Sequence, residues 1–155
     1  MPIKSFRGKI ANEGTDIISL HTNNGSVGYK IVKLELFPVQ PGFGGSEAES
    51  TVKVYSVPQT GTPTAEVDFS DNTLLAVGFV TNVGSSEIYG IDSATVFDNM
   101  VTNQDMYVTH KNLHGDAAAC NYYMELEQMN LDLNENTVAT LKDIRNIKSQ
   151  WSNII

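Results

Sequence analysis

The amino-acid sequence predicts an all-β protein: an antiparallel β-sandwich of jelly-roll-like type, with a short C-terminal helix or arm. Charged residues make up 18% of the chain, against about 25% in an average soluble domain. Asn, Thr, Ser, Gly and Val are abundant instead, and these residues favour turns and strands over helices. Short segments of mixed apolar and polar residues recur between turn sequences, as expected of a sandwich or barrel.

The first half of the chain contains several predicted strands. Residues 3–10 and 15–21 are expected to be strands joined by a tight turn at residues 12–14. A second turn at residues 23–25 leads into the clearest strand, residues 29–37. A long loop over residues 38–50 and a strand over residues 51–57 follow it.

Two of these strands alternate between inward and outward side chains. The side chains expected to face the core are Val32, Leu34, Leu36, Val52 and Val54. Those expected to point away from it are Lys33, Glu35, Thr51, Lys53 and Tyr55.

The second half begins with a loop over residues 58–66 and a nearly continuous apolar run over residues 73–80, which predicts a central strand covered on both faces. Further strands are expected at residues 87–91, 95–97, 105–110 and 120–129. Apolar residues then recur every three or four positions, which predicts a helix. We therefore expect a sandwich domain over residues 1–133 and a helix or arm over residues 134–155, packed on the same domain or on a neighbour.

Composition excludes several classes of partner. The formal net charge of −8 argues against nucleic acid, because phosphate binding depends on Lys and Arg. No apolar window is long enough to span a membrane, and the first residues lack a signal-peptide core. We expect synthesis in a cytoplasm, which agrees with a single cysteine, Cys120, that has no intramolecular disulfide partner.

The sequence contains no pattern that predicts catalysis, a metal or another cofactor. Cys120 opens a predicted strand and is expected to be a small buried side chain, whereas His110 and His114 are expected to be exposed loop residues. Residues 132–143 partly match a calcium loop, but Thr137 stands at the sixth position, where the turn requires glycine. We therefore predict a non-enzymatic protein.

The tyrosines leave one alternative open, a carbohydrate-binding module with glycans as its partner. Aromatic rings stack on the apolar faces of sugars, and several tyrosines lie in predicted strands, although strand tyrosines more often contribute to packing. The candidates are Tyr29, Tyr55, Tyr89, Tyr107, Tyr122 and Tyr123.

Apolar residues at the C-terminus and in one loop are the candidate interface. Apolar side chains at a chain end must fold back onto the domain or dock on a neighbour. Loops rich in glycine and proline are also common contact sites. The candidate interface residues are Ile147, Trp151, Ile154, Ile155 and Phe43.

Five segments resemble small virion structural proteins of the head decoration type from marine tailed phages, including cyanophages. They are residues 4–8, 28–33, 97–110, 121–129 and 134–146. The resemblance implies a virion component present in many copies, made in an infected bacterial host. It also implies that the major capsid protein and further copies of the chain are its partners. A capsid decoration or cement protein is the function expected on this basis, and a ring-forming head-tail adaptor or tail protein is the other structural alternative.

Overall fold

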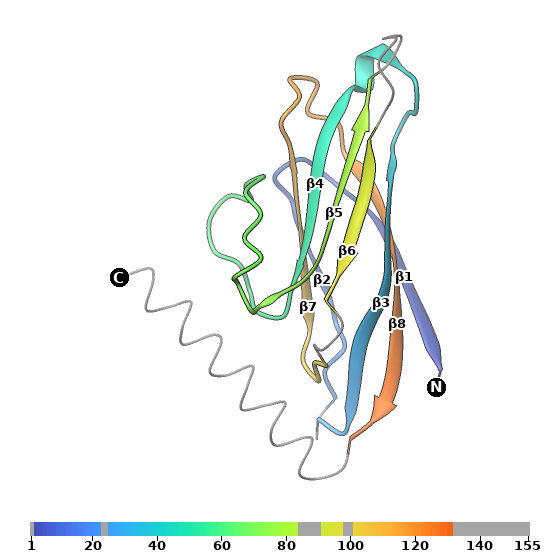
Figure 1. Cartoon of the computed structure of the whole chain (residues 1–155), viewed down its shortest axis with the longest axis vertical. Helices are drawn as coiled ribbons and strands as arrows, with labels where there is room; N and C mark the ends of the chain where they lie inside the picture. Colours follow the sequence, from blue (N-terminus) through green and yellow to red (C-terminus); the bar gives the residue numbers. More distant parts are fainter. Residues whose placement is uncertain (1, 23–24, 84–90, 98–100, 132–155) are drawn as a thin grey trace.

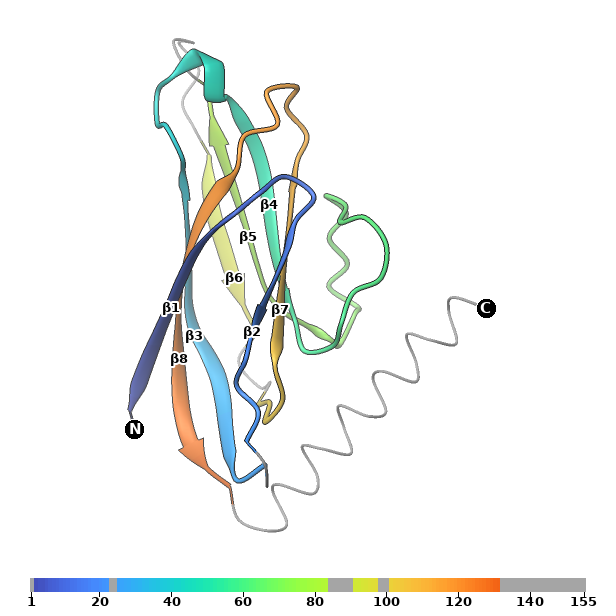
Figure 2. The ribbon, with the colours of Figure 1, turned by 180° about the vertical axis from the view of Figure 1, so that it is seen from behind.

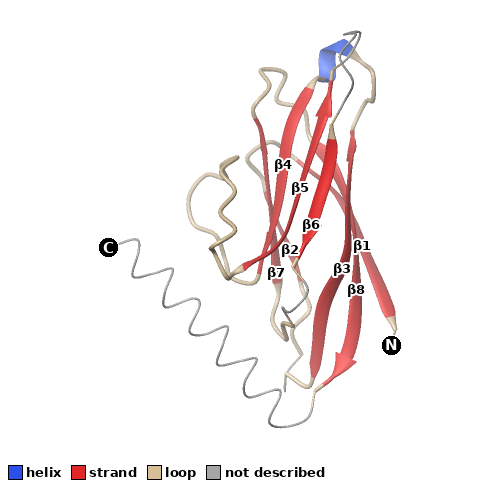
Figure 3. Ribbon diagram, in the orientation of Figure 1, coloured by secondary structure: helices blue, strands red, loops and turns tan. Residues whose placement is uncertain are grey.

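A computed structural model of the chain describes residues 2–22, 25–83, 91–97 and 101–131. Within these residues the regular secondary structure is almost entirely β-strand (Figure 3), which confirms the predicted all-β sandwich. The elements are β1 (Ile3–Ile10), β2 (Thr15–Ile18), β3 (Val27–Pro38), the 3-10 turn η1 (Gly44–Ser46), β4 (Ala48–Tyr55), β5 (Leu74–Asn82), β6 (Asp92–Val96), β7 (Met106–Asn112) and β8 (Cys120–Asn130).

The strands form two antiparallel sheets that pack face to face (Figure 1). The three-stranded sheet has the order β1-β8-β3, and the five-stranded sheet has the order β2-β7-β4-β5-β6. β1 thus pairs with β8, β2 with β7 and β4 with β5, which is the nested pairing of a jelly roll. The fourth nested pair of a jelly roll would join β3 to β6. Here β6 forms its strand pairing with β5 instead, and it contacts β3 without pairing with it.

The predicted turn at residues 12–14 exists, but it does not make a hairpin. Gly14 donates a hydrogen bond from its N–H to the carbonyl of Ala11 at 2.9 Å, and Glu13 takes a positive φ of 63°. The turn carries the chain from one sheet to the other (Figure 2), so that β1 and β2 find different partners. A local turn sequence specifies that the chain changes direction. Which sheet each strand joins depends on its pairing partners, which lie far away in the sequence.

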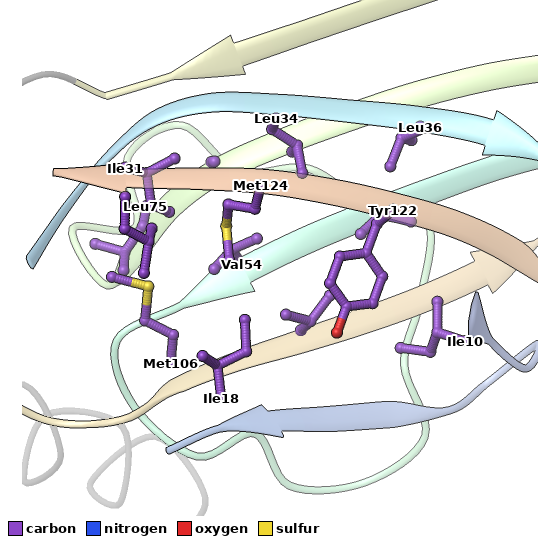
Figure 4. Close-up of a cluster of buried hydrophobic side chains, with 14 of the residues drawn as sticks. Ile10, Ile18, Ile31, Leu34, Leu36, Val54, Leu75, Met106, Tyr122 and Met124 are labelled. Atoms are coloured by element: carbon purple, nitrogen blue, oxygen red, sulfur yellow. The ribbon is translucent and has the colours of Figure 1, made fainter. Parts of the chain in front are cut away.

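The core lies between the two sheets and is built from the inward side chains of both (Figure 4). Leu34 and Leu36 of β3 and Met124 of β8 are buried on the three-stranded side, and Val52 and Val54 of β4 are buried on the five-stranded side. Burial of such side chains contributes roughly 1.5–3 kcal/mol each. The sheets approach so closely that a Cβ at Gly78 of β5 would lie 2.9 Å from a methyl of Leu36.

The predicted inward position of Val32 is wrong. Ile31 pairs with Leu126 and Lys33 pairs with Glu125, so Val32 is the extra residue of a β-bulge. A bulge interrupts the two-residue period, and Val32 is 40% exposed while Ile31 is 3% exposed. The alternation on either side of the bulge holds, because Leu34 and Leu36 are buried as predicted.

The face of β4 predicted to point away from the core does so, but a later segment of the chain covers it. Thr51, Lys53 and Tyr55 are all buried, although they lie on the side of β4 away from the core. The chain after β4 returns over this face, and the Lys53 ammonium donates a hydrogen bond to the carbonyl of Glu66 at 2.6 Å. Burial lowers the pKa of Lys53 and raises the pKa of Tyr55 to about 12. An alternation with a period of two residues predicts which face of a strand points toward the core. It does not predict whether a loop covers the opposite face.

The remaining predicted elements agree with the structure where it describes them. β5 is an internal strand buried on both faces for most of its length, as the apolar run predicted. β6, β7 and β8 lie where strands were expected, within a few residues at their ends. The expected strand over residues 87–91, apart from its last residue, and the C-terminal segment 134–155 lie outside the described residues, as does the partial calcium loop beyond residue 131. Among the described residues, no helix has the length and apolar character needed to cross a lipid bilayer.

Candidate functional site

The outward face of the three-stranded sheet places residues from both ends of the chain side by side. Strand register sets Arg7 of β1 opposite Tyr123 of β8, and Tyr123 opposite Glu35 of β3. The neighbouring outward row consists of Lys9, Asn121 and Phe37. Since side chains alternate along each strand, both rows point away from the core.

Residues from both rows line a depression of about 570 Å³, which we call the outer-face depression. Its lining includes Arg7, Glu35, Phe37, Asn121 and Tyr123. Phe37 is 62% exposed, the most exposed large apolar side chain among the described residues. The depression therefore combines an open aromatic ring with charged and amide groups.

The sheet beneath the depression depends on one glycine. A Cβ at Gly8 would lie 3.0 Å from the ring of Tyr122, so a larger residue would require this ring to shift. The Tyr122 hydroxyl donates a hydrogen bond to the carboxylate of Asp16 at 3.1 Å. Desolvation and the nearby Asp16 carboxylate raise the pKa of Tyr122. Tyr122 thus joins β8 to β2 and keeps the floor of the depression in place.

Most charged groups around the outer-face depression have partners, and Arg7 does not. The Lys33 ammonium lies 3.1 Å from the Glu35 carboxylate, and this contact raises the pKa of Lys33. The Tyr123 hydroxyl donates to Glu125 at 2.8 Å, which raises the pKa of Tyr123. Within the described residues, Arg7 makes neither an ion pair nor a hydrogen bond through its side chain.

The predicted tyrosine platform does not form as a single surface. Tyr29, Tyr55 and Tyr122 are each less than a tenth exposed, so they serve packing. Tyr89 lies outside the described residues, and Tyr123 is the tyrosine that lines the open face of the three-stranded sheet. Sequence reasoning missed Phe37, although the alternation that placed Lys33 and Glu35 outward continues to it. No pattern in the sequence pointed to Arg7 as a site residue.

Cys120 belongs to a buried polar group rather than to a reactive site. It is 1% exposed, which confirms the prediction of a small buried side chain. Burial raises the pKa of its thiol to about 11, so the thiolate is disfavoured at neutral pH. The Ser50 hydroxyl, which contacts the Cys120 thiol, lies 2.9 Å from Nε2 of His110.

The prediction that His110 is an exposed loop residue is wrong. His110 lies in β7 and is fully buried. Its Nδ1 lies 3.1 Å from the carbonyl oxygens of both Ile10 and Ala11. In the neutral ring, Nδ1–H donates to these carbonyls and Nε2 accepts from the Ser50 hydroxyl. His110 therefore ties the end of β1 to β4 and β7, which explains a polar ring in the core.

Native protein is expected to resist alkylation of Cys120 by iodoacetamide, because both burial and a raised pKa suppress attack by its sulfur. Mass spectrometry after brief exposure at neutral pH should find the thiol unmodified. The same protein unfolded in urea should be fully modified and serves as the control. Rapid labelling of the folded chain would contradict the buried position of Cys120.

His114 lies apart from His110 and meets two carboxylates instead. Its Nε2 is 2.9 Å from Glu47, and its Nδ1 is 3.6 Å from Asp116. The three groups lie within 4.8 Å of one another, which is close enough for metal ligands. They are already engaged, since Asp116 accepts the N–H of Glu47 at 2.9 Å and His114 Nδ1 accepts the N–H of Asp116 at 3.1 Å. The cluster joins the loop before β4 to the loop between β7 and β8.

The segment around η1 and the loop between β7 and β8 lie at the same end of the sandwich (Figure 1). Phe43, directly before η1, is 56% exposed, and Leu113, directly after β7, is 61% exposed. The loop that carries Phe43 is held by Asn82, which accepts the N–H of Gly42 at 2.9 Å and donates to the carbonyl of Ser46 at 2.8 Å. We call Phe43, Glu47, Leu113, His114 and Asp116 the apical surface.

The predicted interface residues are only partly placed by the structure. Phe43 is exposed on a loop held by hydrogen bonds, where a partner has access to it. Ile147, Trp151, Ile154 and Ile155 lie outside the described residues. Leu113 was missed, because a single leucine between two polar residues carries no periodic signal.

Comparison with known proteins identifies no family for this chain. No family model matches it, and no curated protein does. A solved structure with a similar arrangement is the mitogen derived from Yersinia pseudotuberculosis, with 13% sequence identity and a TM-score of 0.34. The alignment covers 85% of this chain and 87% of that one. Similarity at this level supports no argument about function.

Proposed function

We propose that this chain is a non-enzymatic structural protein of a tailed-phage virion, a capsid decoration protein that binds the shell and bridges neighbouring subunits. The apical surface is the observation that carries the proposal. It presents two large apolar side chains, Phe43 and Leu113, at one end of a compact sandwich. A protein that attaches to a lattice of identical subunits needs such a contact on a rigid support.

The chemistry of the apical surface indicates what it contacts. Glu47 and Asp116 lie in the same two loops as the apolar side chains, and the chain as a whole carries a formal net charge of −8. The complementary surface on the major capsid protein is therefore apolar with a basic rim. Ile147, Trp151, Ile154 and Ile155 are the proposed contacts to neighbouring copies or to the shell, as expected of an apolar arm.

Phe43→Ala is expected to weaken binding to capsids by about tenfold or more, since burial of a phenylalanine contributes roughly 1.5–3 kcal/mol. The measurement adds purified protein to capsids that lack the chain and follows co-sedimentation. Phe69→Ala is the matched control, because Phe69 is 60% exposed on a different part of the sandwich and should leave binding unchanged.

Two results would overturn the decoration role, and a third would overturn the apical surface as its contact. Virions that contain no copy of the chain would exclude it. A copy number that corresponds to one ring of subunits would instead indicate that the chain is a head-tail adaptor or a tail protein. Equal losses for Phe43→Ala and Phe69→Ala would show that the apical surface is not the contact.

A further inference from the structure

We infer that the outer-face depression is a binding site for an acidic saccharide, a sugar that carries a carboxylate. Nothing in this inference depends on where in a virion the protein resides. The outer-face depression lies on the three-stranded sheet, whereas the apical surface is formed by loops at one end of the sandwich. The two sites therefore make separate predictions.

The size of the depression suits a small ligand. Its volume of about 570 Å³ falls within the range of roughly 300–1,000 Å³ that is typical of small-molecule sites. The floor is formed by paired strands, so the backbone beneath the ligand is already ordered before binding. A preorganised floor reduces the entropy that binding must overcome.

The aromatic lining favours a sugar ring. Phe37 and Tyr123 come from adjacent strands, and Phe37 is 62% exposed although it costs free energy to leave such a ring in water. An aromatic face covers the C–H face of a pyranose, while hydroxyl groups at the ring edge need hydrogen-bond partners. The Asn121 amide lies in the same depression and supplies both a donor and an acceptor.

The charges favour an acidic sugar over a neutral one. Arg7 is exposed and unpaired among the described residues, and Lys9 in the next row likewise has no ion pair there. The charge of Glu35 is compensated by Lys33 at 3.1 Å. A guanidinium binds a carboxylate through two parallel hydrogen bonds, which suits a hexuronic acid at Arg7 of β1. Phe37 of β3, across the same depression, is open to stack on a sugar ring of the bound saccharide.

Titration calorimetry with the full chain tests this inference, with oligogalacturonate as the probe and a maltooligosaccharide of equal length as the neutral comparison. We expect saturable binding of oligogalacturonate and at least about tenfold weaker binding of the neutral sugar, because a charge-assisted bidentate contact is lost. Arg7→Ala and Phe37→Ala should each weaken binding of the acidic probe by about tenfold.

Two matched variants separate specific binding from general effects. Lys4→Ala removes one positive charge from β1, but its partner in the register is the inward-facing Leu126, so it lies on the opposite face from Arg7. Phe69→Ala removes a phenylalanine of similar exposure elsewhere. Both should bind as tightly as the unmodified protein, and thermal unfolding should show that all four variants remain folded.

Several outcomes would overturn the inference. The unmodified protein could fail to bind the acidic probe, or it could bind the neutral sugar equally well. Equal losses for Arg7→Ala and Lys4→Ala would indicate general charge attraction. None of these results bears on capsid binding, so failure here is distinct from failure of the decoration role.

Discussion

Replacement of His110 by leucine is expected to lower the free energy of unfolding by about 3 kcal/mol, one of the largest losses from a single change in this chain. Leucine removes the ring that satisfies the Ser50 hydroxyl and the carbonyls of Ile10 and Ala11. Each buried polar group left without a partner costs roughly 1–3 kcal/mol. Urea denaturation measures the effect.

The control for this change is His114→Leu. The side chain of His114 is 31% exposed and its contacts are ion pairs on loops, so the expected loss is below about 1 kcal/mol. Similar losses in the two variants would contradict the distinct role of His110.

The effect of His110→Leu should depend on pH with a definite sign. Desolvation lowers the pKa of His110 below its ordinary value of 6.5 in the folded protein. As pH falls below that value, the unfolded chain takes up a proton that the folded chain excludes, so this residue stabilises the fold less. The difference between the unmodified protein and the variant should shrink below pH 6.5. A difference that grows on acidification would contradict the buried neutral ring.

Met124→Ala is expected to lower the free energy of unfolding by about 2–5 kcal/mol. Met124 is fully buried and points from β8 toward the five-stranded sheet (Figure 4), so alanine leaves a cavity between the sheets. Denaturation in urea, monitored by circular dichroism, gives the loss.

Two variants test whether the cavity causes this loss. Met129→Ala makes the same substitution at a half-buried, outward position of β8, and it should cost less than about 1 kcal/mol. Met124→Leu preserves most of the volume, and it should cost less than about 1.5 kcal/mol. Losses of similar size in all three variants would mean that Met124 does not fill the space between the sheets.

The candidate sites were only partly predictable from the sequence. Phe43 was identified because an aromatic residue in a loop rich in glycine is exposed. Arg7 could not be identified, since its importance comes from lacking a partner while lying beside Tyr123, more than a hundred residues away. Likewise, Glu47 meets His114 and Asp116 only because the loops before β4 and after β7 end at the same place.

The amino-acid sequence by itself determined the fold class, the strands and the inward faces of strands such as 34–36, because these depend on local patterning of apolar side chains. Only the tertiary structure decided which strands pair, that a bulge turns Val32 outward, and that a loop covers Lys53 and Tyr55. It also decided that His110 is buried and that Arg7 lies open beside Tyr123, in the same depression as Phe37. These features arise from contacts between distant parts of the chain, where burial and pairing depend on what packs against a residue rather than on its neighbours in sequence.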